Sequence, residues 1–129
     1  MPDINTRIES SETRIFKAVF PNTTNHYDTM FGGMAMSLMD EVAFMTATRF
    51  CRKRVVTVSS SKIDFHKPIP HGTIIELIGR VQQVGNTSLL IRVQIFMEEM
   101  YSETREKVIE GEFTFVAIGD DRKPISVIG

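Results

Sequence analysis

The stretch GGMAMSLMDEVAFMTATRF, residues 32–50, decides the expected fold of this chain. After Gly33 it contains no glycine and no proline, so nothing in it interrupts a helix. Its apolar residues nearly encircle the helix axis, which is typical of a helix that other elements surround. We therefore predict one long buried helix over residues 32–50.

Runs of alternating and β-branched residues on both sides of this helix predict strands. One strand is expected before the helix, over residues 12–20, and Pro21 ends it. Four more are expected after it, over residues 55–65, 73–84, 88–97 and 107–118, with Gly85 and Asn86 as a hairpin signal. This order predicts an α+β domain in which an antiparallel sheet of about five strands grips a single helix. The sheet's open side and edges favour a dimer.

The bulk properties indicate one globular domain. The chain has 129 residues, of which 42% are hydrophobic, and a formal net charge of -1, which gives no electrostatic case for binding nucleic acid or a membrane. No stretch reaches the roughly 20 apolar residues of a membrane span. We expect residues 1–10 to be a flexible polar segment and residues 11–129 to be the domain. The single Cys51 cannot form an internal disulfide, which favours the cytoplasm.

Asp40 is the first candidate catalytic residue, because burying a carboxylate in an apolar helix costs free energy unless the carboxylate has a partner or a function. It follows Gly33 by two helical turns, so both residues project to nearly the same side. The amides at Gly32 and Gly33 would begin the helix, where a ligand carbonyl meets the positive end of the helix dipole. That is a workable oxyanion site, and Asp40 could activate water or attack the carbonyl directly.

Each of these residues also has a purely structural interpretation, which the sequence alone leaves open. The two glycines could simply relieve a tight turn into the helix, and Asp40 could face solvent or a buried partner. Asn25 can reach a carbonyl or a water, although asparagine is also a common turn residue. The basic run that ends at Arg54 could be a solvated surface or a grip on phosphates. No Cys or carboxylate stands at metal-ligand spacing beside a histidine, so we predict neither a metal nor another cofactor.

Six short motifs occur in an order that is specific for one protein group. With them the chain resembles a hot-dog-fold acyl-CoA thioesterase of the single-domain bacterial kind related to the brain-type acyl-CoA hydrolases. The resemblance runs over residues 13–127. The motifs are Pro21-x-x-x-Asn25 with Phe31-Gly32-Gly33, Met39-Asp40, Val55-Val56-Thr57-Val58, Phe65-x-Lys67-Pro68, Gly85-x-Thr87-Ser88, and Phe113-Thr114-Phe115-Val116-Ala117.

The resemblance implies a hot-dog fold and a homodimer with a continuous sheet, commonly assembled as a hexamer of three dimers. The site would lie at the subunit interface, with Asp40 as the catalytic carboxylate, Asn25 donated by the partner subunit and the Gly33 amide as the oxyanion donor. The substrate would be a fatty acyl-CoA, hydrolysed to free fatty acid and CoA. Substrate contacts are expected from Gly32, Arg54, Thr57, Ser59, Ser61, Thr87 and Ser88.

The sequence departs from the common pattern of this group at three positions. Thr23 and Ser61 stand where acidic residues are frequent, and Asp28 stands where glycine is usual. Two rival functions remain in view. A hot-dog hydratase or dehydratase would want a histidine paired with a carboxylate in the helix, which this helix lacks. A non-catalytic acyl-CoA-binding module would gain nothing from Asp40.

Overall fold

The computed structural model describes residues 3–20 and 29–129. Helix α2 and all five strands lie where the sequence predicts them, within a few residues at each end. The α+β fold class is therefore confirmed. In chain order the elements are α1 (Ile4–Ser11), β1 (Thr13–Ala18), α2 (Gly32–Cys51), β2 (Arg54–Phe65), β3 (Thr73–Val84), β4 (Ser88–Glu99) and β5 (Arg105–Ile118).

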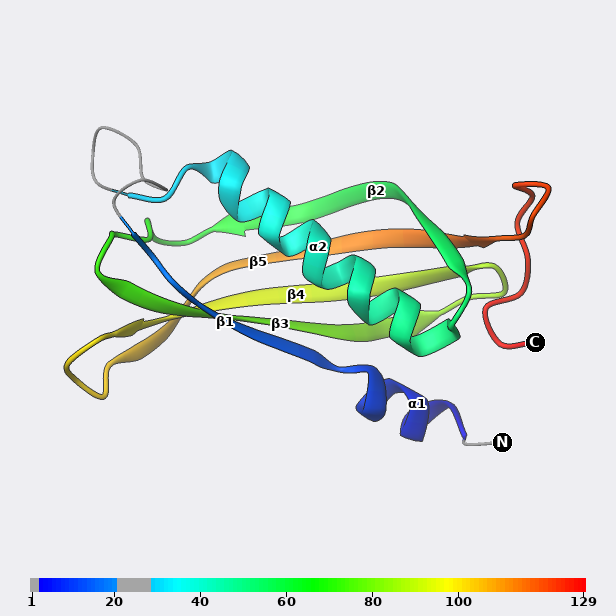
Figure 1. The fold of residues 1–129 in the computed structure, drawn as a ribbon, viewed down its shortest axis with the longest axis horizontal. Helices are drawn as coiled ribbons and strands as arrows, with labels where there is room; N and C mark the ends of the chain where they lie inside the picture. Colours follow the sequence, from blue (N-terminus) through cyan, green and yellow to red (C-terminus); the bar gives the residue numbers. More distant parts are fainter. Residues whose placement is uncertain (1–2, 21–28) are drawn as a thin grey trace.

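The strands form one antiparallel sheet in the order β1-β3-β4-β5-β2, and α2 lies diagonally across one of its faces (Figure 1). Strands β1 and β2 are consequently the two edges. Edge strand β2 has twelve residues, and only Val55 among them is buried. A long, exposed edge of this kind is a place where another chain can pair.

The core lies between α2 and the sheet. Along β5 the side chains of Phe113, Phe115 and Ala117 are buried, and they alternate with residues that face the other way. Gly111 belongs to the buried row, because a Cβ added there would lie 3.2 Å from Met39 Cε of α2. We call this side of the sheet the helix face and the opposite side the outer face. Two residues that lie directly opposite each other on antiparallel strands have their side chains on the same face, so each strand's pairing with β5 shows which face its residues take.

The side of α2 that points away from the sheet is exposed in the single chain. Met36 is 38% exposed and Phe44 is 46% exposed. The sequence predicts a helix surrounded by other elements, and this prediction is wrong for one chain. One sheet layer covers only one side of a helix, so the apolar residues on the other side stay open.

The structure also differs from the sequence at the N-terminus, where the sequence predicts a flexible segment over residues 1–10 and the structure describes residues from Asp3 onward. Ile4–Ser11 form helix α1, which begins at Asp3. The amide of Thr6 donates to Asp3 Oδ1 at 2.7 Å, and this bond holds the pKa of the Asp3 carboxyl below its ordinary value. Arg7 Nη2 then donates to the carbonyl oxygen of Phe50 at 2.8 Å and ties α1 to α2. Such a short polar helix depends on tertiary contacts, which local sequence does not reveal.

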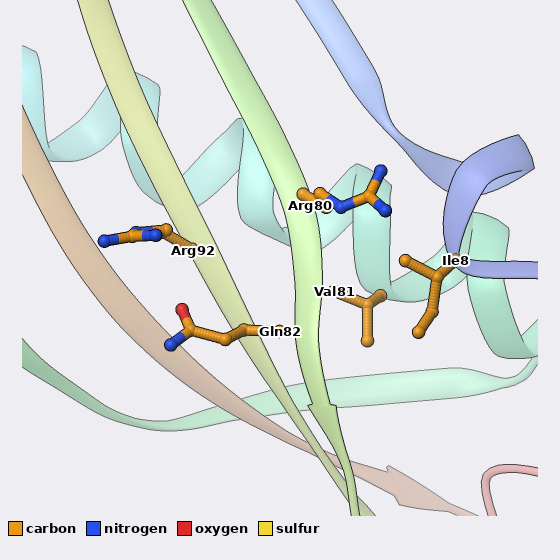
Figure 2. A pocket seen from close by; sticks show the side chains of 5 residues that line it. All are labelled: Ile8, Arg80, Val81, Gln82 and Arg92. Atoms are coloured by element: carbon orange, nitrogen blue, oxygen red, sulfur yellow. The ribbon is translucent and has the colours of Figure 1, made fainter. Parts of the chain in front are cut away.

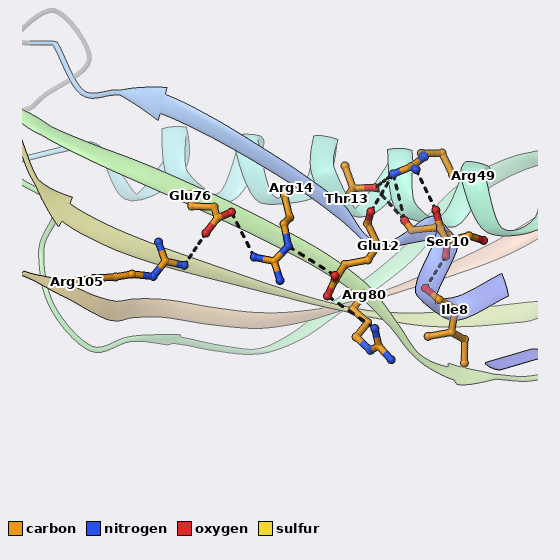
Figure 3. A network of polar contacts seen from close by, with 10 residues as sticks. Ile8, Ser10, Glu12, Thr13, Arg14, Arg49, Glu76, Arg80 and Arg105 are labelled. Carbon is orange, nitrogen blue, oxygen red and sulfur yellow. Dashed lines mark hydrogen bonds and ion pairs between the residues drawn. The ribbon is translucent and has the colours of Figure 1, made fainter. Parts of the chain in front are cut away.

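Arg49 of α2 holds the chain between α1 and β1 (Figure 3). Its guanidinium donates to the carbonyl oxygens of Ser10 and Glu12 and to the hydroxyl of Thr13, each at 3.0 Å. Further along the same network, the buried carboxylate of Glu76 forms ion pairs with arginines of β1 and β5, namely Arg14 and Arg105. The N-terminal segment is thus attached both to α2 and to the sheet.

Close packing of α2 on β3 at Gly79 yields a stability prediction. A Cβ at Gly79 would lie 2.4 Å from Thr46 Oγ1 and 2.9 Å from Val42 Cγ1, both on α2. We expect Gly79→Ala to lower the free energy of unfolding by about 1–3 kcal/mol, because the helix must move away from the sheet. Urea denaturation measures the change. Gly33→Ala is the control, since a Cβ there meets no atom of the described residues within 4 Å. Equal stability of Gly79→Ala and the parent protein would contradict this packing.

Candidate functional site

Asp40 is half-buried on α2, at the seam between this helix and β2. Thr57 Oγ1 donates a hydrogen bond to Asp40 Oδ1 at 3.2 Å. Thr57 pairs with Phe115 of β5, which places it on the helix face, and the strand register shifts immediately after it. A bulge of this kind re-aims side chains along a strand. The carboxylate is therefore held by a hydroxyl from the neighbouring strand.

The N-terminus of α2 is not capped by the side chain of its own N-cap residue. Its N-cap residue is Phe31, which makes no side-chain capping bond, and the first amides of a helix have no acceptor within the helix. A Cβ added to Gly33 would meet no atom within 4 Å among the described residues. The Met30 amide donates to the carbonyl oxygen of Ile69 at 2.7 Å and anchors the helix start. A helix N-terminus that is anchored in this way can receive a carbonyl oxygen.

The spacing of Gly33 and Asp40 suits a small reacting group between them. Seven residues correspond to about 10 Å along a helix axis. The side chain of Asp40 leans back toward the N-terminus, as helical side chains do, and so shortens this gap. A length of this order is comparable with a carbonyl group and one water molecule placed in line.

Phe65 is a neighbour of this opening that the sequence did not place in the site. A Cβ added to Gly32 would lie 3.9 Å from Phe65 Cε1, so the ring stands against the helix start. The signal that could have found it is the Phe65-x-Lys67-Pro68 motif, which served only to recognise the family.

The other predicted substrate contacts on β2 lie on the opposite side of the sheet from Asp40. Arg54 pairs with Ile118, Ser59 with Thr114 and Ser61 with Glu112, all in the row of β5 that faces outward. Ser60 pairs with Phe113 and so takes the helix face. The structure thus separates Arg54, Ser59 and Ser61 from Asp40 by the thickness of the sheet.

Thr87 and Ser88, the two predicted substrate contacts at the turn before β4, have different surroundings. The carbonyl oxygen of Thr87 accepts from the Ala117 amide at 2.9 Å and holds the turn to β5. Ser88 pairs with Val116 and lies on the outer face. It lines a hollow of about 310 Å³ whose other lining residues are Gln83, Gly85, Leu90 and Thr114. The helix face therefore carries Gly32, Gly33, Asp40 and Thr57, the outer face carries Arg54, Ser59, Ser61 and Ser88, and Thr87 lies in the turn. The predicted Asn25, like Thr23 and Asp28, lies outside the described residues.

A second cavity of about 310 Å³ lies beside α1, β3 and β4 (Figure 2). It is lined by Ile8, Arg80, Val81, Gln82 and Arg92, none of which is a predicted site residue. Arg80 forms an ion pair with Glu12 at 3.7 Å, and Arg92 forms one with Glu110. Each guanidinium at this cavity therefore already has a carboxylate partner.

Two further features bear on the type of site. Residues 3–20 and 29–129 contain no group of three or more potential metal ligands. In the same part of the chain, no helix has the length and apolar character needed to cross a membrane.

Removal of the Thr57 hydroxyl tests whether it matters to Asp40. We expect Thr57→Val to lower kcat by about tenfold, the effect of one lost hydrogen bond to a charged group. Thr57→Ser keeps the hydroxyl and should retain most of the activity. Thr57 is exposed on an edge strand, so the free energy of unfolding should change by less than about 0.5 kcal/mol in both variants. Full kcat in Thr57→Val would show that the bond has no catalytic effect.

Comparison with known proteins gives a consistent result. Residues 27–104 match the Thioesterase superfamily. An uncharacterized acyl-CoA thioester hydrolase of Bacillus subtilis is 36% identical over 128 residues, which cover 93% of this chain and 74% of that protein.

Two solved structures agree with this match. An acyl-CoA hydrolase of Staphylococcus aureus, solved in complex with butyryl coenzyme A, coenzyme A and coenzyme A disulfide, has a TM-score of 0.90 and 36% identity over 95% of this chain and 74% of its own. An apo-hexameric acyl-CoA thioesterase has a TM-score of 0.91 and 33% identity over 94% of this chain and 78% of its own. Structures of the Staphylococcus aureus enzyme include variants in which a threonine, an aspartate or an asparagine is replaced by alanine.

Proposed function

The chain belongs to the Thioesterase superfamily and is an acyl-CoA thioester hydrolase, and we propose that it converts fatty acyl-CoA to free fatty acid and CoA at Asp40. The observation that carries this proposal is the hydrogen bond from Thr57 to a carboxylate two turns after the start of a helix whose N-cap side chain makes no capping bond. A base and an oxyanion donor suffice for thioester hydrolysis, without a full triad.

In the proposed mechanism the thioester carbonyl oxygen accepts a hydrogen bond from the Gly33 amide. Asp40 takes a proton from a water molecule, and the water oxygen attacks the carbonyl carbon. The tetrahedral intermediate bears its negative charge on the oxygen at Gly33, where the helix dipole stabilises it. The carbon–sulfur bond then breaks, and the departing CoA sulfur receives the proton from Asp40.

Direct attack by Asp40 on the same carbonyl carbon is the second route that this arrangement permits. It would give a mixed anhydride, which water then hydrolyses. Hydroxylamine added during turnover attacks such an anhydride at one of its two carbonyl carbons. Attack at the acyl carbon gives an acyl hydroxamate and regenerates the Asp40 carboxylate, whereas attack at the Asp40 carbon leaves a hydroxamate on Asp40. A modified Asp40 detected by mass spectrometry would therefore favour the anhydride route over water activation.

We propose a homodimer, further assembled as a hexamer, in which Asn25 of the partner subunit orients the water or the substrate. Two observations support pairing of copies. Edge strand β2 exposes Val56 and Val58 at 41% and 53%, and a similar acyl-CoA thioesterase is hexameric. Burial of such an edge and its apolar residues stabilises an assembly.

The residues on the outer face have a different role in this proposal. The sheet separates Arg54, Ser59, Ser61 and Ser88 from Asp40 of the same chain. We assign them, with Thr87, to contacts with CoA bound at a neighbouring subunit. Arg54 is the residue suited to a phosphate. A cytoplasmic location and the lack of a cofactor remain predictions from the sequence.

A thiol-release assay tests the function and separates it from its rivals. Purified protein is incubated with acyl-CoAs of increasing chain length and a reagent that reports free thiols. A hydrolase releases one CoA thiol for each thioester that is cleaved. A hydratase or dehydratase alters the acyl chain without releasing the thiol, and a binding module changes neither. Absence of thiol release with every acyl-CoA tested would contradict the proposal.

A further inference from the structure

The ring of Phe65 is half exposed although it is large and apolar. Phe65 ends β2 and pairs with Ile109, which is 2% exposed, so its side chain lies on the helix face. Its own exposure is 52%. On one side the ring faces Gly32, where an added Cβ would lie 3.9 Å from Phe65 Cε1. An aromatic surface is therefore open beside the amide that would bind the carbonyl.

The position of this ring relative to the start of α2 is fixed by the backbone. The His66 amide donates to the carbonyl oxygen of Val108 at 2.8 Å, which holds the end of β2 to β5. The carbonyl oxygen of Ile69 accepts from the Met30 amide immediately before α2. The ring and the helix amides therefore belong to one connected piece of structure, as an acyl-binding wall requires.

We propose that Phe65 is a specificity-determining residue whose ring packs against the first methylene groups of the acyl chain. This inference rests on the proposed function, because it takes the thioester carbonyl to be at Gly33. The ring offers no hydrogen-bonding group, so it suits an alkyl chain better than the pantetheine arm, whose amides need polar partners. Each methylene that the ring covers should raise kcat/KM by about fourfold.

The test compares kcat/KM for acetyl-, butyryl- and hexanoyl-CoA in the parent protein and in variants. We expect Phe65→Ala to lower the ratio of butyryl-CoA to acetyl-CoA by about fifteenfold, because two covered methylenes lose their contact. Phe65→Leu, which keeps apolar bulk, should lie between the two. Phe16→Ala is the matched control, since Phe16 is 61% exposed but lies on the other edge strand, and its ratio should not change.

Three results would overturn the inference. The first is an unchanged ratio in Phe65→Ala. The second is an equal loss for all three substrates, which would place the ring against CoA or give it only a supporting role. The third is dissociation of both Phe65 variants in size-exclusion chromatography, which would assign the ring to a subunit interface. Circular dichroism shows whether Phe65→Ala is folded, and if it is not, Phe65→Leu decides. Failure of the proposed function itself differs from all of these, because the parent protein would then release no thiol.

Discussion

Asp40→Asn should nearly abolish thioester hydrolysis, with kcat lowered by about 10²–10⁴, the usual contribution of a positioned general base. The amide cannot take a proton from water and cannot form an anhydride, so both proposed routes fail. Its oxygen can still accept the hydrogen bond that Thr57 donates to Asp40 in the parent protein. We therefore expect the fold and the affinity for CoA to be retained. Thiol release measures kcat, and isothermal titration calorimetry measures CoA binding.

Glu41→Gln is the matched control for this variant. Glu41 is the next residue on α2, and its substitution by glutamine removes one negative charge, as Asp40→Asn does. Glu41 is exposed on a side of the helix that faces β1. Its substitution should leave kcat within about twofold, since a surface charge acts weakly through solvent. Hydrolysis by Asp40→Asn at close to the parent rate would remove Asp40 from the mechanism. A similar loss in both variants would point to a general effect of charge on α2.

Mixing two inactive variants should restore activity if each site takes Asn25 from one subunit and Asp40 from the other. Alone, Asn25→Ala and Asp40→Asn each disable both sites of a dimer. In a mixed dimer, one site combines the two defects and the other site is intact. Random exchange makes about half of the dimers mixed, so about a quarter of the parent activity is expected.

The design of this mixing experiment depends on subunit exchange. The two variants should be unfolded together and refolded, or expressed together with different affinity tags so that the mixed dimer is isolated. Mixing without exchange gives the background. Activity that stays at the background in the isolated mixed dimer would mean that Asn25 and Asp40 of the same chain form one site. Activity of Asn25→Ala alone at the parent level would remove Asn25 from the reaction.

Much of the candidate site follows from local sequence because it lies on one helix. Gly33 and Asp40 are brought to the same side by helical periodicity alone, and the structure forms α2 from Gly32 as expected. The opening at Gly33 is likewise a local property of a helix N-terminus without a capping side chain. Sequence reasoning could therefore place Asp40 and the Gly33 amide on one side of the helix before any tertiary contact was known.

The residues on β2 show where sequence reasoning stops. A regular strand would place Thr57, Ser59 and Ser61 on one face, because side chains alternate with a period of two. The register shift between Thr57 and Ser59 breaks this alternation, so Thr57 reaches Asp40 and the two serines face outward. No residue type in this stretch signals the bulge, which arises from pairing with β5.

The sequence by itself determined the elements of this protein, their order and the one-helix part of its site, because these depend on periodicities within short segments. Tertiary structure decided which side of α2 stays exposed, how Arg7 and Arg49 hold the polar helix α1, and where Phe65 stands beside Gly32. Each of these depends on contacts between segments far apart in the chain. Their free energy comes from packing and hydrogen bonds that exist only once the sheet and α2 have come together.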